Sequence, residues 1–133
     1  AAAAYPGIAS VVTLAVAQTW PSALDAARTV TAPTLHLVAG SDTVAPPAGH
    51  ADPIADAAGG PVWYRLLPKA EHASFLENRH WSDVLLAAKP DPRVRRLTRA
   101  LVTAFLLRQL LGEERVAVLV DGDVKGTELR RYG

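Results

Sequence analysis

The chain has 133 residues, half of them hydrophobic, and a formal net charge of +1. This length and apolar fraction suit one globular domain with its own core, and the near-neutral charge argues against a nucleic-acid partner. The sequence contains no cysteine, which excludes disulfides and thiol chemistry and leaves the cellular compartment open. No run reaches the roughly 18 apolar residues of a membrane span.

The first residues predict the end of a helix. Four alanines at positions 1–4 favour a helix, and Pro6 and Gly7 stop it. We therefore expect the sequence to begin within an element, so that the lack of a signal peptide carries no information about location.

Two strands joined by a short helix are predicted next. The β-branched and apolar run at 8–16 is typical of a strand buried on both faces of a parallel sheet. Residues 19–28 contain a helix-compatible stretch that Ser22 can cap. Residues 34–39 predict the second strand, which ends just before Asp42.

A third strand and a long helix complete the predicted core. Residues 51–58 indicate a short helix, and residues 62–67 indicate the third strand. From Asp91, which can cap a helix, apolar residues recur at helical spacing until Gly112. Four arginines in the first half of this helix are expected on its solvated face: Arg93, Arg95, Arg96 and Arg99.

The last residues give a weaker signal. Residues 115–120 alternate weakly, and residues 121–123 (Asp-Gly-Asp) resemble a turn without the later ligands of a calcium loop. We expect an edge strand or a hairpin there.

The order of strands and helices predicts an α/β fold, with a mainly parallel sheet flanked by helices. No linker divides residues 1–133, so the chain forms part of one domain. Three core strands are few for such a sheet. We expect the remaining strands upstream of residue 1 or in another chain.

Two residues stand where chemistry collects in parallel sheets, at the carboxyl ends of the strands. Asp42 follows the second strand, and His72 follows the third. In a catalytic triad the acid orients the histidine and stabilises the imidazolium that forms when the histidine takes the nucleophile's proton. Asp42 and His72 are therefore candidates for the acid and the base.

The stretch PTLHLVAGSDTVAP at 33–46, followed by His72 after one helix and one strand, resembles the α/β-hydrolase-fold serine esterases. The nearest group comprises the cutinase-like polyester hydrolases and the lipase, chlorophyllase and dienelactone-hydrolase-like esterases. The resemblance covers nearly the whole chain and implies a C-terminal portion of one α/β-hydrolase domain. It implies that Asp42 is the triad acid, that His72 is the general base, and that Trp20 walls the substrate cleft. No cofactor or metal is implied.

The chain departs from this family at the nucleophile. In the fold, the triad serine lies on a G-x-S-x-G elbow and precedes the acid. No such motif occurs in the sequence, and none of its serines has flanking glycines at that spacing: Ser10, Ser22, Ser41, Ser74 and Ser82. We expect the elbow and the N-terminal strands upstream of Ala1.

Each candidate has a plainer interpretation. Asp42 could serve only its own turn, His72 could be a polar loop residue, and Trp20 could be ordinary packing. His36 lies within a strand and is expected to be a core histidine. Two further pairs invite a metal site but match no zinc spacing, so loops are favoured: His50 with Asp52, and His80 with Asp83.

The leading hypothesis is a serine hydrolase that cleaves carboxylic esters, of small-molecule, lipid or polyester type, through an acyl-enzyme. The chain would supply the acid and the histidine, and the missing N-terminal portion of the same domain would supply the serine. A non-catalytic binding or assembly module on the same fold is a rival. Another hydrolase on this scaffold, such as a dehalogenase or a peptidase, is a third possibility, which the identity of the nucleophile decides.

Overall fold

The computed structural model describes residue 5 and residues 7–76 and 91–133. Four strands form one sheet in the order β1-β2-β3-β4: β1 (Val11–Leu14), β2 (Thr34–Ala39), β3 (Val62–Leu67) and β4 (Glu128–Tyr132). The first three strands pair in parallel, and β4 pairs antiparallel with β3. The α/β prediction with a mainly parallel sheet is therefore confirmed.

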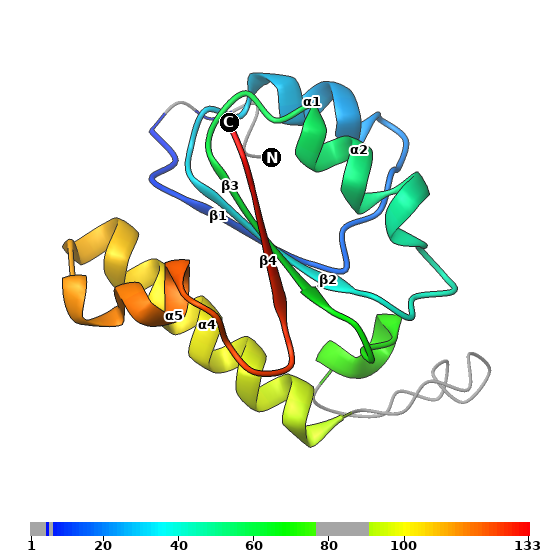
Figure 1. The fold of residues 1–133 in the computed structure, drawn as a ribbon. Coiled ribbons are helices and arrows are strands. Elements are labelled where there is room, and N and C mark those ends of the chain that lie inside the picture. Colours follow the sequence, from blue (N-terminus) through cyan, green and yellow to red (C-terminus); the bar gives the residue numbers. More distant parts are fainter. Residues whose placement is uncertain (1–4, 6, 77–90) are drawn as a thin grey trace.

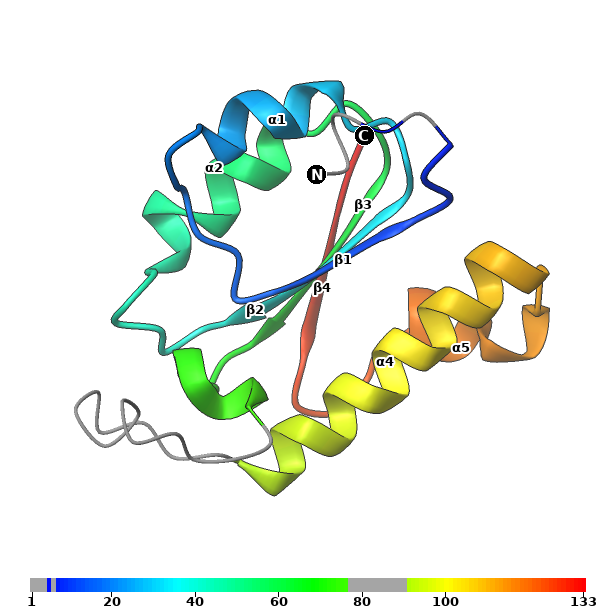
Figure 2. The same cartoon turned by 180° about the vertical axis from the view of Figure 1, so that it is seen from behind.

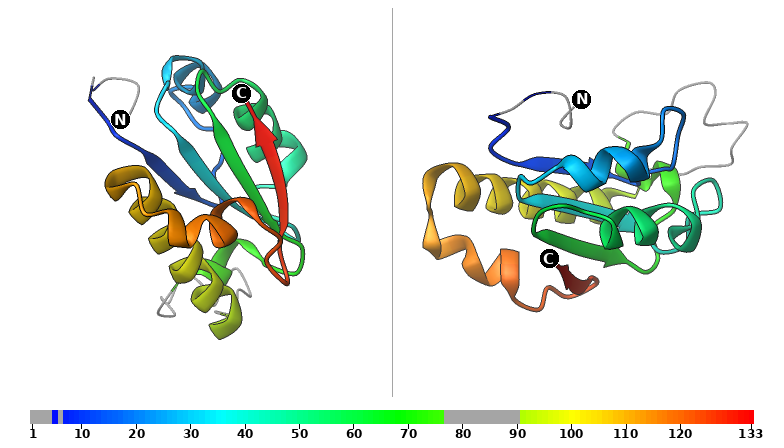
Figure 3. Two further views of the ribbon diagram at one scale, coloured as in Figure 1. Left: turned by 60° about the vertical axis from the view of Figure 1, so that its left-hand side comes forward. Right: turned by 90° about the horizontal axis from the view of Figure 1, so that it is seen from above.

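Helices cover both faces of this sheet (Figure 1). One face carries α1 (Ala23–Thr29) and α2 (Ala51–Asp56), and the other carries α4 (Pro92–Leu111) and α5 (Ala117–Asp121). The view from behind in Figure 2 and the two views in Figure 3 show the same layers. Short 3-10 turns complete the described chain: η2 (Pro47–Gly49), η3 (His72–Phe75) and η4 (Glu114–Val116).

The alternation of side chains along β2 and β3 builds a core on each face. Toward α4, the strand residues Leu35, Leu37 and Trp63 pack with Leu101 and Phe105. Toward α2, Val38, Val62 and Tyr64 pack with Ala51 and Ala55. All six residues of β2 are buried, so this strand is the centre of the domain.

Helix ends follow the predicted caps. The Asp91 carboxylate accepts hydrogen bonds from the backbone N–H groups of Arg93 and Val94, at 2.7 and 3.4 Å. Gly112 ends α4 with φ +65°, a conformation that favours glycine. Ser22 caps α1 by accepting a hydrogen bond from the N–H of Asp25. The predicted helix start at 91–92 and end at 112 are confirmed.

Two predictions need correction. The run 8–16 is strand only over Val11–Leu14, because Ala15 has φ +46° and leaves the extended conformation. The edge strand expected among the last residues is present as β4, but the weak alternation at 115–120 does not belong to a strand, since η4 and α5 occupy that segment. Apolar residues at 116, 119 and 120 face the core at helical spacing. The helix predicted at 1–4 lies outside the described residues.

A buried arginine fixes α5 against the sheet. Arg65 of β3 is 1% exposed. Its guanidinium donates hydrogen bonds to the carbonyls of Leu119, Val120 and Gly122, at 3.0, 3.1 and 2.7 Å, and to the hydroxyl of Thr127. Burial lowers the pKa of Arg65, and the nearby Asp121 and Asp123 oppose that shift. The cation thus caps the carbonyl end of α5, which needs hydrogen-bond donors.

The ends of β2 and β3 continue to pair beyond the strands. Gly40 N–H donates to the Leu67 carbonyl, and Ser41 N–H donates to the Ala70 carbonyl, both at 2.9 Å. A Cβ on Gly40 would lie 2.7 Å from Pro68 Cα and 2.9 Å from the Pro68 carbonyl oxygen. Only glycine permits this close approach of the two chain segments.

Gly40→Ala should lower the free energy of unfolding by about 1–3 kcal/mol, because the new methyl group overlaps backbone that must shift. Gly49→Ala is the matched control, since a Cβ there meets no atom within 4 Å. Urea unfolding of both variants measures the difference. Equal stability of the two would show that the contact at Gly40 carries no constraint.

Candidate active site

Asp42 and His72 come together at the carboxyl ends of β2 and β3. Asp42 lies three residues beyond Ala39, and His72 opens η3 five residues beyond Leu67. His72 Nδ1 lies 2.8 Å from Asp42 Oδ2. A neutral imidazole carries one N–H, so a hydrogen bond to this carboxylate oxygen places the proton on Nδ1 and leaves the lone pair on Nε2.

Both oxygens of Asp42 are used, and for different purposes. Oδ1 accepts hydrogen bonds from the backbone N–H groups of Val44 and Ala45, at 2.9 and 2.8 Å, while Oδ2 faces His72. The residue is 5% exposed. The turn interpretation and the triad interpretation of Asp42 are therefore compatible, because each uses one oxygen. The backbone donors hold the carboxylate in a single orientation.

The turn η3 supports His72, and the side chain of this histidine is partly exposed to solvent. Its side chain is 35% exposed. A capping box supports η3, in which Glu71 N–H donates to Ser74 Oγ at 2.9 Å and the Glu71 side chain accepts from the backbone of Ser74. Phe75 anchors the turn in the core. An oriented imidazole with an accessible second nitrogen can accept a proton from a group outside the pair.

Three of the serine hydroxyls in the described chain, those of Ser22, Ser41 and Ser74, have partners other than His72. Ser22 Oγ accepts from Asp25 N–H and from Gln18 Nε2, and Ser41 Oγ donates to the Pro68 carbonyl. Ser74 is buried in the capping box. Among residues 7–76 and 91–133, no serine hydroxyl is hydrogen-bonded to His72; Ser82 lies outside this range.

Exposed apolar side chains follow all three parallel strands at the edge where the pair lies. Trp20 follows β1 and is 94% exposed, so it does not pack in the core of the described chain. Val44 and Leu76 follow β2 and β3 and are 52% and 44% exposed. Val44 and Leu76 were not predicted from the sequence, although they lie close to Asp42 and His72 along the chain.

The remaining histidines have structural partners. His36 is buried in β2, as predicted, and its Nδ1 lies 2.6 Å from Thr13 Oγ1. His50 Nδ1 accepts a hydrogen bond from Gln18 N–H, and Asp52 accepts one from the Tyr64 hydroxyl. His80 and Asp83 lie outside the described residues. Within the described part of the chain, no three metal-ligating side chains gather, and no helix is long and apolar enough to cross a membrane.

Burial lowers the pKa of His36 to about 4 from its usual 6.5. The folded state therefore binds fewer protons than the unfolded state between these values, so stability falls as the pH drops from about 6.5 toward 4. We expect this one group to cost about 3 kcal/mol at pH 4.

Urea unfolding at pH 7 and pH 4 measures this cost. His36→Phe should lose less stability over the interval than the natural sequence, by about the same 3 kcal/mol. Identical losses in the two proteins would assign the pH dependence to other groups.

The chain matches no protein-family model, and it matches no curated protein. Its chemistry is therefore inferred from residues and geometry. The feature on which that inference rests is the Asp42–His72 pair at the edge where β2 and β3 end.

Proposed function

We propose that this chain belongs to an α/β-hydrolase-fold serine hydrolase of carboxylic esters and supplies the acid and the general base of its catalytic triad. The observation that carries the proposal is the 2.8 Å hydrogen bond between His72 Nδ1 and Asp42 Oδ2. It joins a buried, doubly anchored carboxylate to a half-exposed imidazole at adjacent strand ends. That arrangement matches the roles of acid and base in a triad.

The proposed reaction uses the free nitrogen of His72. Nε2 takes the proton of a serine hydroxyl while the serine oxygen attacks the ester carbonyl, and Asp42 stabilises the resulting imidazolium. The imidazolium then protonates the leaving alkoxide, which departs as an alcohol and leaves an acyl-serine. Water attacks that acyl group after giving a proton to Nε2, and the serine takes the proton back as the acid product leaves.

The proposed nucleophile lies outside these 133 residues, on a G-x-S-x-G elbow. The engaged hydroxyls of Ser22, Ser41 and Ser74 support this assignment, because each already bonds to another group. The sheet of the complete domain would continue beyond β1, which pairs only with β2 among the described strands.

An apolar acyl group or polyester segment is the proposed substrate. Trp20, Val44 and Leu76 offer exposed apolar surface on the loops around the pair. A contiguous apolar patch on a protein surface often marks a binding site, and we propose that these three side chains contribute to one such patch. We propose that Trp20 forms one wall of the substrate cleft.

In the protein that carries the elbow, His72→Ala and Asp42→Asn should each lower kcat for p-nitrophenyl butyrate by roughly 10³- to 10⁴-fold. His72→Ala removes the proton acceptor, and Asp42→Asn no longer fixes the imidazole tautomer. Asp25→Asn, an exchange of the same kind at an exposed carboxylate on α1, should leave kcat unchanged.

A fluorophosphonate probe distinguishes the rival functions. Labelling of a serine that depends on His72 supports the proposal, because the reaction needs an activated hydroxyl. A protein that is neither labelled nor active on esters would be a binding module or another hydrolase. Ser41→Ala should retain labelling, since this hydroxyl is engaged with Pro68.

Trp20→Ala should raise KM for long-chain p-nitrophenyl esters more than for the acetate, with kcat changed little. Its near-complete exposure implies that the free energy of unfolding stays within about 0.5 kcal/mol of the natural value. Chain-length profiles of KM, with urea unfolding as the control, test both statements. If the substitution changed KM by the same factor at every chain length, Trp20 would not line the substrate cleft.

A further inference from the structure

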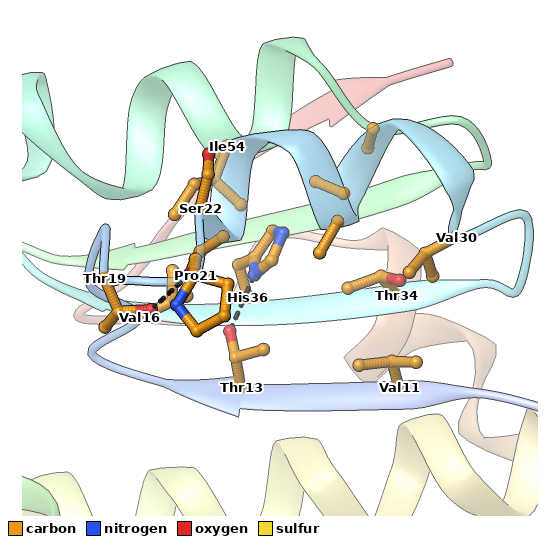
Figure 4. Close-up of a pocket in the computed structure, with 14 residues that line it drawn as sticks. Val11, Thr13, Val16, Thr19, Pro21, Ser22, Val30, Thr34, His36 and Ile54 are labelled. Atoms are coloured by element: carbon orange, nitrogen blue, oxygen red, sulfur yellow. Dashed lines mark hydrogen bonds between the residues drawn. The ribbon is translucent and has the colours of Figure 1, made fainter. Parts of the chain in front are cut away.

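A second candidate site lies away from the Asp42–His72 pair, between the sheet and helix α1. It is a cavity of about 430 Å³, and neither member of the pair lines it. β1 and β2 form its floor, α1 forms its roof, and Ile54 of α2 closes one side (Figure 4). The volume lies within the usual range for small-molecule pockets.

The lining is mainly apolar. Eight of the residues around the cavity are valine, alanine or isoleucine: Val11, Val16, Ala23, Ala26, Ala27, Val30, Ile54 and Ala58. The small alanines of α1 leave room above the strands, where larger side chains would fill the space. A ligand for this cavity must therefore be mostly hydrophobic.

One polar ring stands in this mainly apolar lining, which also includes four hydroxyl side chains: Thr13, Thr19, Ser22 and Thr34. His36 is 3% exposed, and its ring stands between β2 and α1 with Thr13 beside it (Figure 4). Nδ1 lies 2.6 Å from Thr13 Oγ1. Within the part of the chain that the structure describes, Nε2 makes no hydrogen bond and is not fully shielded, so it is open to a ligand in the cavity.

The partner of Nδ1 determines what Nε2 can offer. We assign the Thr13 hydroxyl as the donor to Nδ1, because it has no other hydrogen-bond acceptor among the described residues. The proton of the neutral ring then lies on Nε2. Because burial lowers the pKa of His36 to about 4, the ring remains neutral at physiological pH. Nε2–H is thus an uncharged donor in an apolar cavity.

We propose that this cavity binds a small hydrophobic molecule that carries one hydrogen-bond acceptor, of the ketone or ester carbonyl class, with its oxygen on His36 Nε2–H. The apolar lining holds the body of the ligand, and His36 orients it. Thr19, Pro21 and Ser22 also line the cavity, so the ligand contacts the loop that carries Trp20. This site does not depend on the proposed ester hydrolysis.

The test compares indanone with indane, two probes of nearly the same shape that differ by a carbonyl. Titration of the ¹⁵N-labelled full protein, followed by NMR of the histidine rings, should show that indanone shifts the Nε2 resonance of His36. Indanone should bind roughly fivefold tighter than indane, the preference that one neutral hydrogen bond gives. The absence of a shift, or equal affinities for the two probes, would overturn the proposal. A cavity that another segment of the full protein fills would give this negative result.

Two substitutions locate the site. His36→Phe removes the donor and should abolish the preference for indanone, whereas Ala27→Leu fills the cavity and should abolish binding of both probes. Thr29→Leu adds a similar group to the exposed side of α1, outside the lining, and should bind like the natural sequence. Persistence of the preference in His36→Phe would contradict the assignment. The measurement on the natural sequence decides the matter if a variant does not fold.

Discussion

The parallel pairing of β2 with β3 fixes the position of every group in the candidate active site. The six-residue register from Thr34–Val62 to Ala39–Leu67 continues through the hydrogen bonds of Gly40 and Ser41. Asp42 and His72, 30 residues apart in sequence, therefore leave the sheet side by side. Because β2 is buried on both faces, we expect this pairing to be well protected from local opening.

Strong local signals made much of this fold predictable. Continuous apolar runs gave β2 and β3 their correct bounds, and the caps at Asp91 and Gly112 gave α4 both ends. The segment 115–120 was mispredicted because its helix depends on a distant partner, whereas the edge strand expected after it is present as β4. Arg65 supplies hydrogen-bond donors to the end of α5 from more than 50 residues away. No local pattern in 115–120 reveals that a buried cation lies opposite.

The candidate active site, like the fold, could be predicted only in part. Strand ends and residue types were enough to propose Asp42 and His72, since topology brings such positions together. One carboxylate oxygen of Asp42 accepts hydrogen bonds from the backbone and the other faces His72. This arrangement depends on the backbone geometry of the turn, which could not be predicted from the sequence pattern. The unpartnered Nε2 of His36 likewise emerges only when the small side chains of α1 are seen above it. A buried histidine was expected there, but the space around it was not.

Because Asp42 and His72 lie beside their strand ends, residues can be inserted between them without moving either side chain. The segment between them, through η2 and α2, leaves the sheet after Asp42 and returns to it at β3. Lengthening the exposed turn around Gly49, where nothing crowds the chain, would add only the slowly growing entropy of a longer loop. The domain could thus acquire new surface features over this turn while the spacing of its acid and its histidine stayed the same.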